Sequence, residues 1–164
     1  MKPGTEDKNL IALAGEYHVL AQLAERGIVG ALTLGHTKGI DILAHNPRTG
    51  RMRRVEVKAT RRRPTRAELW HPGSEGAYAW TMSAKHEAIT DSNLLYCFVW
   101  LGGAMIQPRI FVVPGTEVAR YVKWEHRLWL KSRNRRLNPN NPMRQFRVDT
   151  KDPLDYQGNW VLFD

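Results

Sequence analysis

Residues 39–44 read GIDILA and residues 55–60 read VEVKAT, and together they place three charged residues inside apolar, strand-like runs. A charge in such a run is costly unless it is paired or binds a metal ion. Side chains two apart on a strand share a face, so Glu56 and Lys58 project together while the valines beside them point into the opposite layer. The two segments therefore predict a charged cluster on one face of a sheet.

A turn between the two segments brings the cluster together. Residues 46–50 read NPRTG, which is strong turn chemistry, so we expect the chain to reverse there and a strand at 52–60 to return beside Asp41. Two carboxylates at close range repel each other, and a hard divalent cation with oxygen ligands relieves that repulsion. We expect Asp41 and Glu56 to bind Mg²⁺, with Mn²⁺ as an alternative ion, and Lys58 to handle a water molecule.

This arrangement resembles the PD-(D/E)XK nuclease superfamily. Asp41 matches its first acidic position and Glu56-Val57-Lys58 matches its (D/E)-x-K. The resemblance covers about residues 5–62 and includes Gly15-Glu16-Tyr17, which is similar to the helix-borne acidic residue of many members. Ile40 stands where the motif has proline, in the Gly-x-Asp form that resolvase-like branches also show, so the branch stays open.

The resemblance implies an α/β (α+β) fold with a restriction-endonuclease-like αβββαβ core, in which helices flank a central mixed sheet. It implies a Mg²⁺-dependent endonuclease that hydrolyses DNA phosphodiester bonds, with Asp41, Glu56 and Lys58 as catalytic residues. The metal ligands would be Asp41, Glu56, the main-chain carbonyl of Val57 and, as an outer ligand, Glu16. An ordinary surface position for Glu16 is an equally open interpretation. Lys58 would orient the attacking water and stabilise developing charge.

Size and charge favour one soluble nucleic-acid-binding domain. A chain of 164 residues is long enough for one domain with a real core, so we predict a single domain over residues 1–164. The net charge of +9 indicates a polyanionic partner, for which we predict nucleic acid, and the resemblance implies that it is DNA. Membrane partners are disfavoured because no apolar run approaches the length of a span and no signal-peptide pattern occurs.

The lone Cys97 has no intramolecular disulfide partner, and we predict a cytoplasmic location. The sequence leaves a homodimer or higher homo-oligomer open.

A basic segment follows the second strand directly. Residues 61–76 combine arginines with prolines and glycines, which predicts a loop. Because this loop leaves the strand just after Lys58, we expect it to contact phosphate groups. The residues assigned to DNA binding are Arg61, Arg62, Arg63, Arg66 and Lys38.

The remaining elements follow from periodicity and caps. We expect a helix at 5–26 with Thr5 as its N-cap, and its apolar stripe consists of Leu10, Leu13, Ala14, Tyr17, Leu20, Ala21 and Ala24. We expect further elements as follows: strands at 31–34, 94–101 and 109–113, a short helix at 83–91 capped by Ser83, and a helix from Thr116 to about 133. From about 134 onward we expect an irregular basic C-terminal extension with short strands near Phe146 and Trp160.

Other chemistries fit the sequence less well. The six histidines show no zinc-ligand spacing, and there is only one cysteine. The tryptophans can stack on bases; we expect Trp100 and Trp129 in the core and leave Trp70, Trp80 and Trp124 open. Two alternative functions remain, a structure-selective nuclease resembling Holliday-junction resolvases, and a non-catalytic nucleic-acid-binding module whose acidic cluster is an ion-pair network.

Overall fold

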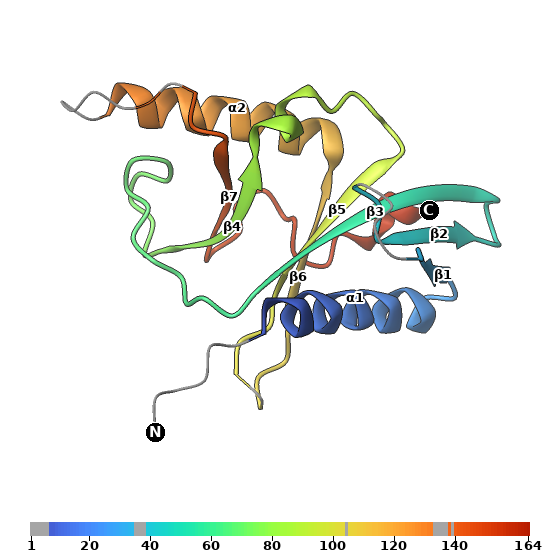
Figure 1. Ribbon diagram of the computed structural model, residues 1–164. Coiled ribbons are helices and arrows are strands. Elements are labelled where there is room, and N and C mark those ends of the chain that lie inside the picture. The colour runs from blue at the N-terminus through green and yellow to red at the C-terminus, as the bar shows by residue number, and fades with distance from the viewer. Residues whose placement is uncertain (1–6, 35–38, 104, 133–137, 139) are drawn as a thin grey trace.

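The computed structural model describes residues 7–34, 39–103, 105–132, 138 and 140–164. Within these ranges the chain forms a mixed five-stranded sheet, a separate two-stranded sheet and two α-helices, which is an α+β arrangement. Figure 1 shows α1 along one side of the larger sheet and α2 with the smaller sheet on the other side. The elements in chain order are α1 (Lys8–Glu25), β1 (Val29–Leu32), β2 (Ile42–Asn46), β3 (Arg51–Thr60), β4 (Ala77–Ser83), the 3₁₀-helix η1 (Ala84–Ala88), β5 (Leu94–Trp100), β6 (Arg109–Pro114), α2 (Gly115–Lys131), β7 (Met143–Asp149) and the 3₁₀-helix η2 (Trp160–Phe163).

The larger sheet has the order β1-β2-β3-β5-β6. Its neighbours are antiparallel except β3 and β5, which run parallel. The predicted reversal at 46–50 is confirmed, since the Gly50 amide donates to the Asn46 carbonyl at 2.8 Å and Gly50 takes the positive φ of 71° that glycine tolerates. This turn joins β2 to β3 and so fixes the register of the two strands that carry the charged cluster.

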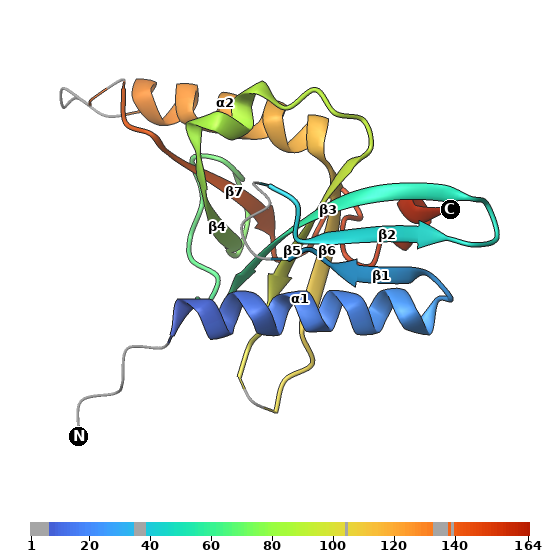
Figure 2. The ribbon, with the colours of Figure 1, turned by 45° about the vertical axis from the view of Figure 1, so that its right-hand side comes forward.

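A parallel pair requires a crossover connection, and here the crossover contains β4 and η1 (Figure 2). The short helix expected at 83–91 with Ser83 as its N-cap is confirmed in its start and its cap, but it is the 3₁₀-helix η1 and ends at Ala88. The reason is length, because β4 extends to Ser83 and the chain turns again at Asp91 to enter β5. The mixed sheet is confirmed, whereas the α element expected within the crossover is absent from residues 61–93, all of which the structure describes.

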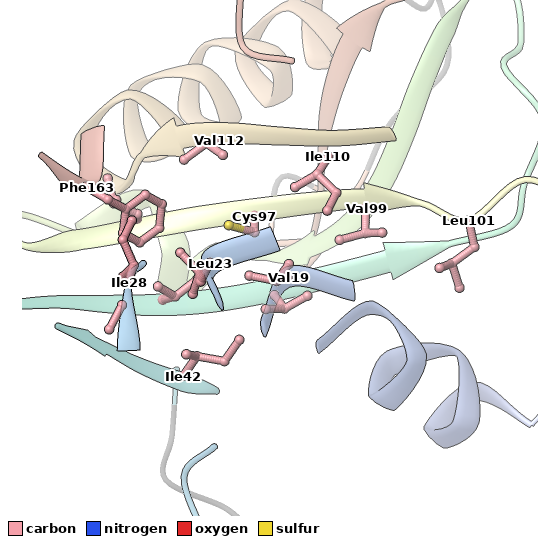
Figure 3. Close-up of a cluster of buried hydrophobic side chains, with 14 residues drawn as sticks. Val19, Leu23, Ile28, Ile42, Cys97, Val99, Leu101, Ile110, Val112 and Phe163 are labelled. Atoms are coloured by element: carbon pink, nitrogen blue, oxygen red, sulfur yellow. The ribbon is translucent and has the colours of Figure 1, made fainter. Parts of the chain in front are cut away.

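The two faces of the sheet bury separate apolar clusters. Along β5, Leu95, Cys97 and Val99 pack into the cluster beneath α1, while the alternate residues Tyr96 and Phe98 pack into the cluster beneath β4, β7 and α2. Figure 3 shows the first cluster, where Val19 and Leu23 of α1 meet residues of the sheet and Phe163 of η2. The fully buried strand predicted at 94–101 is confirmed, because burial on both faces accounts for its unbroken apolar run.

Helix α1 presents a different face to the sheet from the one expected. Its buried residues are Gly15, Val19 and Leu23, whereas Leu10 and Tyr17 of the predicted stripe are 65% and 56% exposed. Close approach decides the orientation, because a Cβ at position 15 would lie only 2.6 Å from the Cβ of Ala59 in β3. The glycine lets the helix backbone rest on β3. The helix also begins later than expected, with Asp7 as N-cap, and Thr5 lies outside the described residues.

The C-terminal third is more regular than expected. β7 pairs with β4 over its whole length, from Ala77 with Asp149 to Ser83 with Met143. The strand expected near Phe146 is therefore confirmed, but it belongs to the packed core, and β4 was not expected at all. The segment near Trp160 is a 3₁₀-helix and not a strand. α2 begins at Gly115, with Pro114 and not Thr116 in the N-cap position.

Neither described α-helix combines the length and the apolar character that a membrane crossing requires.

We predict that Gly15→Leu destabilises the protein by about 1–3 kcal/mol, because the added side chain would separate α1 from β3. Urea unfolding followed by circular dichroism measures this. Ala21→Leu, at an exposed position of the same helix, is the matched control and is expected to stay within about 0.5 kcal/mol of the wild type. Equal stability of the two variants would show that the close contact does not orient the helix.

Candidate active site

Asp41 lies just before β2, beside the part of β3 that carries Glu56. The ladder ends with Ile42 opposite Val55, so Asp41 and Glu56 are the next residues beyond that pair on their two segments. The Asp41 amide donates to the Val55 carbonyl at 2.8 Å, and its Oδ2 accepts from the Val57 amide at 2.6 Å. The carboxylate of Asp41 is thus fixed to the backbone at the centre of the Glu56-Val57-Lys58 segment.

Glu56 is a buried carboxylate held by three donors. Its exposed fraction is 4%. The Tyr96 hydroxyl donates to Oε2 at 2.7 Å. Lys58 Nζ lies 2.6 Å from Oε1, and His86 Nε2 lies 3.3 Å from the same oxygen. The donors come from three elements, namely β3, η1 and β5.

These contacts keep Glu56 ionised in spite of its burial. Burial would raise the pKa of Glu56, but the hydrogen bond from His86, the charge and hydrogen bond of Lys58 and the hydrogen bond from Tyr96 together lower it to about 2. Burial, followed by the nearby charge of Glu56, raises the pKa of the Tyr96 hydroxyl, so that it remains a donor. The site is therefore built around a permanent negative charge.

His86 is held by its contacts with Ser83. Its Nδ1 lies 2.9 Å from the Ser83 carbonyl and 3.1 Å from both the Ser83 amide and the Ser83 hydroxyl, while its Nε2 faces Glu56. Ser83 lies at the N-cap of η1, so the start of this short helix positions the imidazole. His86 is 4% exposed and acts on the site through Glu56.

Two further carboxylates are coupled to Glu56 and Lys58. Burial raises the pKa of Asp41, and the charge of Glu56 adds to this, against the opposing effects of the Val57 amide and Lys58. Burial and the charge of Asp41 likewise raise the pKa of Glu16, and Lys58 again opposes the shift. Glu16 is half-buried on α1, next to Gly15. Three carboxylates with one ammonium group make a locally negative site, which favours a divalent cation.

The donor set fits a magnesium ion with few protein ligands. Within the described part of the chain no group of three or more His, Cys, Asp or Glu side chains is arranged to hold a metal ion. Mg²⁺ often binds proteins through only one or two carboxylates and keeps several waters, so Asp41 and Glu56 are ligands of the type that it uses. Asp41 is the more available ligand, because Glu56 already accepts from three donors.

Cavities open on both sides of the Glu56 and Lys58 pair. Lys58 lines one of about 530 Å³ together with Lys8, Arg61 and Arg62. Glu56 lines the other, of about 300 Å³, with His86 and Tyr96. The first cavity is basic, and its residues include some from the start of α1 and from the segment after β3.

The predicted DNA-binding arginines all lie on the surface. Arg61, Arg62, Arg63 and Arg66 are exposed, and the first two line the cavity beside Lys58. The segment is anchored, since the Trp100 indole donates to the Arg62 carbonyl at 3.0 Å. Lys38 lies outside the described residues. Lys8 was missed because it lies far from the motif in sequence and reaches the cavity only through the packing of α1.

The sequence also missed the residues that support Glu56. His86 was considered only as a zinc ligand, and Tyr96 only as part of an apolar run. A signal for each was present: histidine three residues after Ser83 fits a helix-capping pattern, and tyrosine carries a hydroxyl that needs a partner when buried. Neither signal names Glu56 as the partner.

Searches with protein-family models, curated proteins and solved structures found no match for this chain.

We predict that the carboxylate of Glu56 contributes to the free energy of unfolding at neutral pH and that this contribution is lost when Glu56 is protonated in acid. Its folded-state pKa of about 2 lies below its ordinary value of 4.5, so its contribution is present above about pH 4.5 and is lost as the pH falls towards 2. The full contribution is roughly 3 kcal/mol. Urea unfolding between pH 7 and 3 should therefore show a weaker pH dependence for Glu56→Gln than for the wild type.

The matched control for this experiment is Glu25→Gln, at an exposed position near the end of α1. It should follow the wild-type pH dependence. Parallel curves for Glu56→Gln and the wild type would mean that the carboxylate is not preferentially ionised in the folded protein.

Proposed function

We propose that this protein is a Mg²⁺-dependent endonuclease that hydrolyses DNA phosphodiester bonds. The observation that carries the proposal is the Asp41 carboxylate bound to the Val57 amide, next to Glu56 in the chain, with Lys58 Nζ 2.6 Å from the Glu56 carboxylate and the basic segment leading away from it. The order of these residues resembles the PD-(D/E)XK superfamily. The sheet is mixed, as the resemblance implies, but the crossover from β3 to β5 lacks the implied α-helix.

In this mechanism the carboxylate of Asp41 holds the metal, and Glu56 and the Val57 carbonyl complete the protein ligands. When bound by these residues, Mg²⁺ or Mn²⁺ would supply Lewis-acid chemistry, lowering the pKa of a water and offsetting negative charge on the phosphate. Glu16 contributes from α1 as an outer, water-mediated ligand. Asp41 Oδ2 remains hydrogen-bonded to the Val57 amide, so the ligand is oriented before the metal arrives.

Lys58 orients the attacking water and stabilises developing charge. Its ammonium group is engaged by Glu56, which suits a fixed cation better than a proton acceptor. At 30% exposure its side chain also reaches the basic cavity, from which a phosphate group would approach. Arg61 and Arg62 line the same cavity and would contact neighbouring phosphates.

Two alternatives share these residues. A structure-selective nuclease, resembling Holliday-junction resolvases, would use the same chemistry on branched DNA. A non-catalytic DNA-binding module is favoured by one observation, the three donors that already occupy Glu56. In that case the acidic cluster would be an ion-pair network and would bind no metal.

We predict that Asp41→Asn abolishes Mg²⁺-dependent cleavage and that Lys58→Met lowers its rate on the order of 10²-fold. Asparagine still accepts from the Val57 amide but removes the charge that binds the metal. Single-turnover cleavage of supercoiled plasmid, linear duplex and four-way junction, each with Mg²⁺ or EDTA, measures both effects. Lys123→Met, on the exposed side of α2, is the matched lysine control and should cleave as the wild type does.

Thermal unfolding in EDTA separates loss of chemistry from loss of folding. Because burial and the charge of Glu56 raise the pKa of Asp41 in the folded state, its charge lowers the free energy of unfolding, and Asp41→Asn should unfold at a higher temperature than the wild type. Mg²⁺ should stabilise the wild type but not this variant. A wild type that neither cleaves nor gains stability from Mg²⁺ would establish the binding module instead. Preference for the four-way junction would identify the resolvase-like activity.

We predict that replacing Arg61, Arg62 and Arg63 with glutamine weakens binding to all DNA sequences alike. Removing each phosphate contact should reduce the slope of log K against log salt by about 0.9. Binding titrations at several salt concentrations, in EDTA, give this slope. Arg48→Gln, at the opposite end of β3 in the turn after β2, is the matched control. An unchanged slope in the triple variant would place the DNA elsewhere on the protein.

A further inference from the structure

A third cavity lies away from the Glu56 site, on the other side of the small sheet. Its volume is about 440 Å³, within the range of small-molecule sites. Figure 1 shows the segment between β3 and β4 curling back beneath α2, beside β7, and the cavity is lined from these three parts. Trp70 of this segment and His126 and Trp129 of α2 are among its lining residues. Trp129 is thus not the core residue that the sequence predicted.

His126 supplies an unused polar atom in this cavity. Its exposed fraction is 7%, and its Nε2 is buried without a hydrogen-bond partner among the described residues. A buried polar atom left unpaired costs about 1–3 kcal/mol. The imidazole stacks on Trp129, with ring centroids 5.5 Å apart and an angle of 22° between the ring planes. The ring is therefore held in place, and its buried Nε2 is left without a partner by the described residues.

The charges of the cavity are already compensated. Arg147 forms an ion pair with Glu125, and its guanidinium lies 3.7 Å from the centroid of Trp70. Arg144 forms an ion pair with Glu87 of η1. Because both arginines have carboxylate partners, a free phosphate gains little here.

A metal ion and a purely apolar ligand also fit this cavity poorly. Among its described lining residues, only Glu125 and His126 are of the types that usually ligate metals, and Glu125 is paired with arginine. An apolar ligand would leave His126 Nε2 unpaired. The chemistry that remains is a flat aromatic group with a hydrogen-bonding edge.

We propose that this cavity binds one unpaired nucleobase of the DNA, which stacks against the tryptophans and hydrogen-bonds to His126 Nε2. This inference rests on the proposed function, which makes DNA the partner, and the net charge of +9 favours binding to a nucleic acid. The segment that carries the exposed arginines begins directly after β3 and reaches Trp70, so one stretch of chain borders both the Lys58 cavity and this one. A strand held by its phosphates along that segment would present a base to the tryptophans.

The test compares two duplexes that differ by one base. Each carries a single extra nucleotide in one strand, either an adenosine or an abasic residue, and binding is measured by fluorescence anisotropy in EDTA. Base stacking on an aromatic residue contributes about 1–3 kcal/mol, so the wild type should bind the adenosine duplex roughly 5- to 150-fold more tightly. Equal binding of the two duplexes would overturn the inference.

Two variants test whether the tighter binding of the adenosine duplex depends on residues that line the cavity. His126→Phe keeps an aromatic ring against Trp129 and removes the unpaired nitrogen, so it should unfold at the same or a higher temperature while losing most of the preference for adenosine. Trp129→Leu should lose the preference too. Trp124→Leu, on an exposed part of α2 that does not line the cavity, is the matched control and should keep it. A His126→Phe protein that is less stable but fully retains the preference would show that the histidine is purely structural.

Plasmid cleavage with Mg²⁺, measured on the same preparations, separates this inference from the proposed function. Absent cleavage together with a retained adenosine preference would overturn the nuclease and leave the base site standing. Cleavage without any preference would do the reverse.

Discussion

The ionised carboxylate of Glu56, buried between two layers of the protein, is the constraint on which the site and one side of the fold depend. A buried charge is tolerated only with close partners, and removing one partner of such a group typically costs several kcal/mol. The partners here are Lys58 on the same strand, His86 on η1 and Tyr96 on β5. They tie the crossover and the next strand to β3, so that the position of η1 is set by an electrostatic requirement as well as by apolar packing.

The local part of this arrangement could be predicted from the sequence. Alternation along a strand puts Glu56 and Lys58 on one face, and the turn at 46–50 brings Asp41 back to them, so short-range rules were sufficient. The partners of Glu56 could not be predicted in this way. His86 and Tyr96 arrive only after a long crossover, and neither residue type specifies which distant carboxylate it will meet.

The errors in the fold have a similar origin. The apolar stripe on α1 was chosen by counting large side chains, but a glycine decides how closely a helix approaches a sheet, and Gly15 contacts β3 while Leu10 and Tyr17 remain exposed. β4 was missed because its partner, β7, lies far along the chain, in a region whose asparagines, prolines and arginines suggested irregular structure. A strand's pairing depends on its partner, and single-segment composition does not report that partner.

The parallel pairing of β3 with β5 has a consequence for the order in which the site can assemble. The β2 and β3 hairpin closes through a short turn and needs little loss of chain entropy, whereas β5 joins only after residues 61–93 have been traversed. A nascent hairpin would therefore bring two carboxylates together with only Lys58 to offset their repulsion. His86 and Tyr96 come with the later, non-local step, so the acidic pair is held in place only once the sheet is complete. Formation of the site and closure of the sheet are in this sense a single cooperative event.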